Sequence, residues 1–297
     1  MTVTALKQKA EPAKAGTATP AAKVLSLAAP VRNRAMLTRL RRYVTQNVLP
    51  PTVVIVALLG LWQIAIGPDS ALPSPLGIWE QSGDLILHPF YVAGSQDMGL
   101  GWRVLTSLER VGVGFGLAAV MGVLVGAIIG QSAWLLRGVD PLFQVLRTVP
   151  PLAWLPISLA AFMDSRPSAI FVIFITAIWP IIINTAAGVR AIPRDYRNVA
   201  SVLRLNQIEF FFKIMVPSAA PYIFSGLRIG VGLAWLAIVA AEMLTGGVGI
   251  GFFIWDAWNS SMLTDIFVAL LYIGVTGFAL DRLVAFIGRV VSRGTMA

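Results

Sequence analysis

The sequence predicts an all-α membrane protein with six transmembrane helices, and three observations support that prediction. Hydrophobic residues make up 57% of the 297 residues and charged residues only 12%, against roughly 25% charged residues in a soluble domain. The mean hydropathy is +0.78. Six separate stretches stay apolar over about 20 residues, the length at which a helix crosses a hydrocarbon core about 30 Å thick. Each stretch must be helical, because lipid offers the backbone no hydrogen-bond partners.

The composition also excludes several kinds of site. The chain has no cysteine and a single histidine, His88, which is expected in an outer loop. A disulfide framework, a thiol nucleophile and a Cys/His metal cluster are therefore ruled out. A membrane enzyme is disfavoured, because no spaced set of His, Asp or Ser residues offers a base and a nucleophile together.

The first 47 residues are expected to lie outside the spans. Residues 1–32 are rich in Ala, Lys, Thr and Pro and have no apolar run, so they are expected to form a disordered basic tail. No apolar core follows their lysines, which argues against a cleaved signal peptide. Residues 33–47 place apolar and basic side chains on opposite helical faces. They are interpreted as an interfacial amphipathic helix, with a merely solvated tail as the alternative.

The membrane domain is expected to fill residues 48–297. Its six spans are placed approximately at 48–66, 111–130, 141–163, 168–189, 222–244 and 266–287. The third span contains three prolines, Pro150, Pro151 and Pro156, so we expect it to be kinked and shielded by its neighbours.

The second span carries a small residue at every fourth position, which lets another helix approach closely. These residues are Gly114, Ala118, Gly122, Gly126 and Gly130. An unpaired chain would leave this stripe and a polar pathway facing lipid, so we expect two copies, or this chain and a close relative, to pack face to face.

The basic residues predict the orientation. With the N-terminus inside, nineteen of the 23 Lys and Arg residues fall in inner segments. Three fall in outer loops, Arg103, Arg110 and Arg166, and Arg228 lies within the fifth span. This positive-inside asymmetry predicts cytoplasmic N- and C-termini. It also accounts for the sequence pI of about 10.5 without nucleic acid as a partner.

A polar hairpin at residues 190–217 interrupts the apolar chain on the predicted cytoplasmic side. Pro193 and Asp195 indicate the start of a short helix. One face of that helix is apolar and holds Tyr196, Val199, Ala200 and Leu203.

A second short helix is predicted at 207–216. Asn206, followed three residues later by Glu209, forms a capping-box pattern at its start, and Pro217 is expected to end it. A helix-turn-helix elbow between two spans fits a knob that another protein grips, and an ordinary solvated loop is the alternative.

The hairpin resembles the coupling segment of ATP-binding cassette (ABC) importer permeases, whose pattern is Glu-Ala-Ala, then Gly, then an apolar-Pro pair. The matching positions are Asn198, Val199, Ala200, Arg204 and the pair Val216-Pro217. The second Ala and the Pro are kept, whereas Asn198 replaces Glu and Arg204 replaces Gly. The flanking sequences resemble the nitrate, taurine, sulfonate and bicarbonate branch of these permeases. They are FQVLRTVPPLAWLPI before the hairpin and PYIFSGLRIGVGLAWLAIVAAEMLTGGVGIGFFIWDAWN after it. The segment VLRL within the hairpin is more similar to the nitrate and bicarbonate members.

This resemblance, which covers about residues 102–289, implies the transmembrane subunit of a type I importer in a bacterial inner membrane. It implies a homodimer with two ATPase subunits and an outer solute-binding protein. It places ATP and Mg on the ATPase subunits, so this chain would be non-catalytic and carry no cofactor. The residues implied in ATPase coupling are Tyr196, Asn198, Val199, Ala200, Leu203, Arg204 and Pro217.

Two glycine-rich stretches, GVGFG and GGVGIG, superficially resemble nucleotide loops. Neither joins a strand to a helix and neither has a Walker lysine, so nucleotide binding by this chain is not expected. Residues 246–251 are interpreted instead as an outer turn where the chain re-enters.

Polar groups within the spans are costly and mark a candidate pathway for the solute. They are Arg147, Asn184, Arg228 and Glu242. The two arginines could equally snorkel to the inner face. Glu242 is too short for that and is expected to pair within the bundle or cap the Gly-rich turn. The resemblance implies a small inorganic anion, nitrate (nitrite) first, and positive charge toward the membrane interior is compatible with such a solute. Bicarbonate, cyanate and a sulfonate stay open, as does a channel or scaffold without an ATPase.

Overall fold

The computed structural model describes residues 41–42, 44–67, 70–94 and 97–294, and it divides the chain into two compact units, Met1–Leu61 and Trp62–Ala297. The expected tail at 1–32 lies outside the described residues, as does most of the expected interfacial helix at 33–47. A π-helix, η1 (Val44–Val48), leads into α2 (Leu49–Ala65). Together they form a helix long and apolar enough to cross a membrane, as predicted for the first span.

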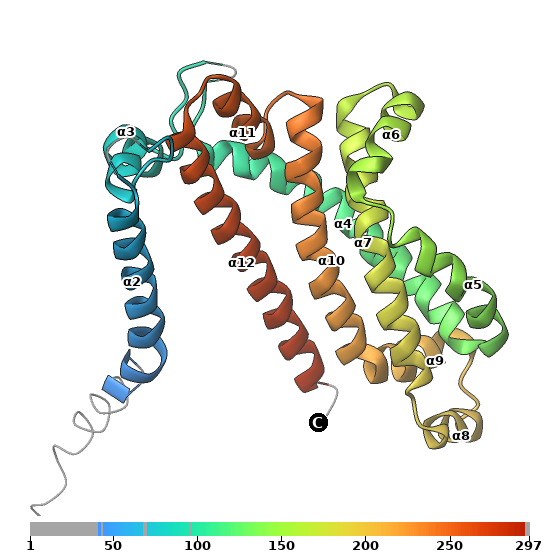
Figure 1. Ribbon diagram of the computed structural model, residues 1–297. Helices are drawn as coiled ribbons and strands as arrows, with labels where there is room; N and C mark the ends of the chain where they lie inside the picture. The colour runs from blue at the N-terminus through green and yellow to red at the C-terminus, as the bar shows by residue number, and fades with distance from the viewer. Residues whose placement is uncertain (1–40, 43, 68–69, 95–96, 295–297) are drawn as a thin grey trace, which may run out of the picture. The chain divides into compact units, whose positions relative to one another are not determined.

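The second unit consists of helices (Figure 1). Within its described residues no strand forms, and one isolated bridge joins Val92 to Met98. The helices in chain order are α3 (Pro75–Leu87), α4 (Leu100–Gln131), α5 (Ala133–Leu146), η2 (Pro151–Trp154), α6 (Leu155–Phe162), α7 (Ser165–Arg190), α8 (Arg194–Val202), α9 (Gln207–Phe210), η3 (Phe211–Met215), α10 (Val216–Thr245), α11 (Ile250–Asn259) and α12 (Leu263–Gly294).

Five helices of the described chain can cross a membrane, and a sixth span exists only if the bent pair of α5 with η2 and α6 is counted as one. The predicted third span at 141–163 corresponds to this bent pair, and its prolines mark the expected kink, which bends the pair by 94°. Pro150 and Pro151 have no N–H, and they disfavour helical backbone in the residues before them. Because of this, α5 stops at Leu146 and a new helix begins at Pro151.

Helix α4 begins at Leu100, well before the predicted start at residue 111. Arg103 and Arg110, expected in an outer loop, therefore belong to this helix. Partners make the extension possible: Arg103 donates to the Met98 carbonyl at 3.2 Å, and Arg110 pairs with the Glu242 carboxylate.

The centre of the core is α7, which packs most extensively against α4 and α10. A Cβ added to Gly114 would lie 2.8 Å from Ile173, and one added to Gly122 would lie 2.8 Å from Ile181. The small-residue stripe of α4 is thus a packing face, as predicted. The expectation that it faces a second copy is wrong, because α7 of the same chain covers it.

Candidate functional site

The first arm of the hairpin is α8, which begins where the sequence predicted. Pro193 precedes the helix and Asp195 lies in its first turn. Three of the four side chains predicted for the apolar face are exposed: Tyr196 by 50%, Val199 by 51% and Leu203 by 63%. They offer a partner protein an apolar surface, which we call the hairpin patch.

Ala200 does not belong to the hairpin patch. It is only 7% exposed and borders a small cavity next to Gln131 and Phe210. The predicted apolar face therefore divides in two, with Ala200 packed inward and the larger side chains outward. Asn198 is exposed on the same helix.

The turn after α8 is a Schellman motif, a helix end in which a left-handed residue lets two N–H groups return to the last turn. Leu205 N donates to Ala200 O at 3.1 Å, and Arg204 N donates to Ser201 O at 3.2 Å. Arg204 has φ +50°, in the region that favours glycine. A left-handed conformation favours Gly, which the coupling pattern has at this position, and Arg204 adopts that conformation here.

The second arm starts with the predicted capping box. Glu209 N donates to the Asn206 side chain at 2.7 Å, and Asn206 N donates to the Glu209 carboxylate at 3.1 Å. The predicted end at Pro217 is wrong, since α9, η3 and α10 follow one another as a single helical stretch, Gln207–Thr245. Pro217 lies in the first turn of α10, directly after the π-helical turn η3. The hairpin is thus directly continuous with a spanning helix.

A cavity of about 670 Å³ lies beside the hairpin. It brings together three of the predicted coupling residues, Tyr196, Val199 and Pro217. Its other walls come from the ends of α7 and α12, from η3 and from the start of α10, so the hairpin is not packed tightly against the bundle on this side.

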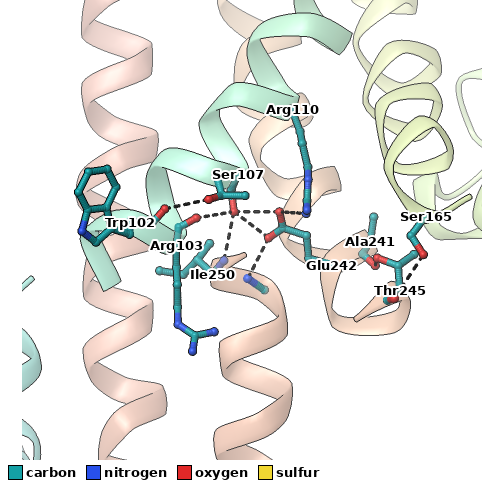
Figure 2. A network of polar contacts seen from close by, with 11 residues as sticks. Trp102, Arg103, Ser107, Arg110, Ser165, Ala241, Glu242, Thr245 and Ile250 are labelled. Carbon is teal, nitrogen blue, oxygen red and sulfur yellow. Dashed lines mark hydrogen bonds and ion pairs between the residues drawn. The ribbon is translucent and has the colours of Figure 1, made fainter. Parts of the chain in front are cut away.

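At the opposite end of α10, Glu242 is the centre of a buried polar network (Figure 2). Its carboxylate is 0% exposed and lies 2.7 Å from Arg110 Nη1. The Ser107 hydroxyl donates to it at 2.8 Å and itself accepts from Ile250 N at 3.1 Å. Gly251 N donates to the second carboxylate oxygen at 3.1 Å. Glu242 therefore both pairs within the bundle and caps the Gly-rich turn.

The glycines of the turn are required by this network. A Cβ on Gly249 would lie 2.3 Å from the Glu242 carboxyl carbon, and one on Gly251 would lie 2.0 Å from Val239 O. The chain can re-enter as α11 only because its backbone passes directly over the carboxylate. Ser107 and Arg110 were not among the predicted site residues, because their position on α4 gave no local signal.

The four candidate pathway residues lie in three separate places. Arg147 and Asn184 line one cavity of about 360 Å³ between the α5–η2 break, α7 and α10. Arg228 instead forms an ion pair with Asp281 on α12, with Nη2 2.8 Å from Oδ2. Glu242 is enclosed in the network described above. The structure thus joins Arg147 with Asn184 and separates both from Arg228 and Glu242.

The sequence of residues 119–295 matches the family described as the inner membrane component of binding-protein-dependent transport systems. This match covers more than half of the chain. The chain belongs to this family of permeases. The resemblance to ABC importer permeases inferred from the hairpin is thereby confirmed, and the permease is an integral inner-membrane protein.

Close relatives of the permease cover most of its length. It is 58% identical over 246 residues to the nitrate import permease protein NrtB of Synechocystis sp., which is 82% of this chain and 90% of that protein. It is 56% identical to NrtB of Leptolyngbya laminosa, over 80% of this chain and 86% of that protein. It is 49% identical to the bicarbonate transport system permease protein CmpB of Synechocystis sp., over 84% and 90%.

The fold also matches a solved transporter. A permease chain from inward-facing structures of the MetNI methionine ABC transporter superposes with a TM-score of 0.57 at 17% identity, over 65% of this chain and 95% of that chain. This similarity supports the type I importer fold predicted from the sequence.

Proposed function

We propose that the permease is the membrane-spanning subunit of an ATP-driven importer of nitrate, with nitrite as a related solute. The observation that supports this is the 53–58% identity to three nitrate import permeases over at least 80% of the chain. We assign ATP and Mg binding to separate ATPase subunits.

The assembly we propose contains a second permease copy, two ATPase subunits on the cytoplasmic side and an outer solute-binding protein. The stripe on α4 no longer supports the second copy, because α7 covers it. The proposal rests instead on the family and on the half-exposed Arg228–Asp281 pair, a charged surface that lipid would not accommodate. We assign both termini to the cytoplasm, an orientation that the distribution of basic residues supports.

The hairpin patch is the surface we assign to the ATPase. Movement of the ATPase subunits would reach the pathway directly, because the second arm of the hairpin continues into α10. Because Val199 is half exposed, the substitution Val199→Asp should disrupt that contact without placing a charge in the core of the permease. We expect Val199→Asp to lose ATPase association, while a charge at an exposed polar position of α9, Gln207→Glu, leaves it unchanged. Equal association of both variants with the ATPase would show that the hairpin patch is not the docking surface.

Bicarbonate is the second candidate solute, since two bicarbonate permeases are 49% and 50% identical to this chain. Taurine, other sulfonates and cyanate are the remaining alternatives. A channel without an ATPase would not need the capped hairpin.

The test is complementation of a bacterium that lacks its own nitrate importer. Cells that express the permease with its ATPase and binding protein are expected to take up labelled nitrate at micromolar supply and grow on it. Uptake of bicarbonate with no uptake of nitrate would move the assignment to the second candidate. Uptake of taurine alone would contradict both.

A further inference from the structure

The broken helix of the permease borders a cavity that the proposed function does not yet explain. This cavity, which Arg147 and Asn184 share, has a volume of about 360 Å³, on the order of ten times the ~30 Å³ that a water molecule occupies in the liquid. Its walls come from the break between α5 and η2, from α7 and from α10. It has room for a small ion with part of its hydration shell.

The depth of this cavity follows from the residues of α7 that line it. They run from Ile175 to Asn184, on both sides of the middle of the helix Ser165–Arg190. On α10, Ile229 and Leu233 lie near the middle of their own helix. The cavity is therefore near the middle of the spans. Backbone that is neither helix nor strand is tolerated at such a depth where it lines a cavity, which is what residues 147–150 do.

Arg147 is the one ionisable group among the described residues that line this cavity. The four ion pairs found in the described ranges involve other residues. A guanidinium at this depth is costly unless it meets a partner or water, so its position suits a site for an anion that comes and goes.

The remaining polar groups complete the site. Pro180 interrupts the hydrogen bonds of α7 at this level, and Asn184 donates one amide hydrogen to the Pro180 carbonyl at 2.8 Å. Its second amide hydrogen is available to a ligand. The indole rings of Trp154 and Trp179 supply flat, apolar walls.

We propose that this cavity binds a small planar oxyanion, of the nitrate or bicarbonate kind, during its passage through the permease. The planar fork of a guanidinium donates two parallel hydrogen bonds to two oxygens of a flat anion. The amide of Asn184 can donate to the third oxygen, and the indole walls fit the flat faces. The proposal rests on the proposed function and adds to it a site with Arg147 as the principal contact.

The first test uses the absence of cysteine from the chain. Thr176, which lines the cavity, is replaced by cysteine as the only thiol of the permease in the full complex. We expect a negatively charged methanethiosulfonate reagent to modify Thr176→Cys at least about tenfold faster than a positively charged one, because Arg147 attracts it. Added nitrate should slow the reaction. The preference for the anionic reagent should disappear when Thr176→Cys is combined with Arg147→Gln. It should persist when Thr176→Cys is combined with the control Arg137→Gln, which removes an exposed charge of α5 outside the cavity.

The second test measures transport. With binding protein saturated by nitrate, we expect Arg147→Gln to lower ATP-dependent uptake at least about tenfold, the value of one charge-assisted hydrogen bond. Arg147→Lys should retain part of the rate, since it keeps the charge and loses the fork. Arg137→Gln should stay within about twofold of the original rate. Assembly of each complex is checked by size-exclusion chromatography.

The outcomes separate this proposal from the proposed function. If the unaltered complex imports nitrate and Arg147→Gln imports it equally fast, the cavity site is wrong and the assigned function stands. The cavity site is also wrong if Thr176→Cys reacts without charge preference and nitrate gives no protection. If the unaltered complex imports no planar oxyanion, the proposed function fails, and with it the ligand assigned to this cavity.

Discussion

Replacing Glu242 by alanine should strongly destabilise the permease, because this carboxylate satisfies several buried donors at once. It is 0% exposed, and its partner Arg110 has a side chain only 16% exposed. Removing one partner of a buried ion pair costs about 3–5 kcal/mol, since the other charge stays buried without compensation. The Gly251 N–H would lose its acceptor as well. Against a total stability of roughly 5–15 kcal/mol, that is a large fraction.

The measurement is the midpoint of thermal unfolding of the purified complex, followed by fluorescence-detected size exclusion. We expect the midpoint for Glu242→Ala to fall by on the order of 10 °C. Replacing both members of the pair by apolar residues, as in Arg110→Met with Glu242→Leu, should cost less than Glu242→Ala alone, because no charge is left unpaired.

The control uses the second Glu–Arg pair of α4, between Glu109 and Arg166, whose side chains are about three-fifths exposed. Such surface pairs contribute little, so Glu109→Ala should leave the midpoint almost unchanged. A Glu242→Ala variant that unfolds within about 2 °C of the unaltered complex would refute the role assigned to the buried network.

Three further predictions follow from local geometry. Gly251→Ala would bring its Cβ within 2.0 Å of a carbonyl oxygen of α10 and should destabilise the complex by about 1–3 kcal/mol. Gly112→Ala, whose Cβ would have no atom within 4 Å, should be neutral or stabilising, and equal melting temperatures of the two variants would contradict this packing. Arg204→Gly relieves a left-handed residue and should raise hydrogen-exchange protection of the hairpin, by about 1 kcal/mol; lower protection would contradict the strain. Arg228→Gln should reduce the yield of assembled complex, and adding Asp281→Asn should restore part of it, since the neutral pair leaves no lone charge; a yield that the second change lowers further would count against the pairing.

Local signals in the sequence predicted much of the hairpin. Pro193 and the Asn206–Glu209 spacing act over a few residues, and both helix starts are where they indicated. The length of apolar stretches likewise predicted six spans, of which five are single spanning helices and the third is the bent pair. Arg204 stands where the coupling pattern has Gly, and in the structure it is the left-handed residue of a Schellman turn.

Contacts between distant segments were not predictable in the same way. Glu242 and Arg110 are in contact although they lie 132 positions apart in the chain, and the periodicity of either segment does not indicate its partner. The partner of the α4 stripe was predicted wrongly for the same reason, since a row of small residues indicates a close approach without saying which helix approaches. The proline-rich third stretch had the hydropathy of a span, and only the three-dimensional fold shows that it turns by 94° and opens a cavity.

The measurement that tests this account most directly is ATP-driven uptake by vesicles that contain only the reconstituted complex of permease, ATPase and binding protein. We predict that labelled nitrate accumulates against its gradient and that this uptake requires ATP on the side of the membrane where the hairpin lies. We also predict that Val199→Asp abolishes the uptake. Nitrate that equilibrates equally well without ATP, or with the Val199→Asp variant, would show a passive pathway and contradict the assignment of the permease to an ATP-coupled anion importer.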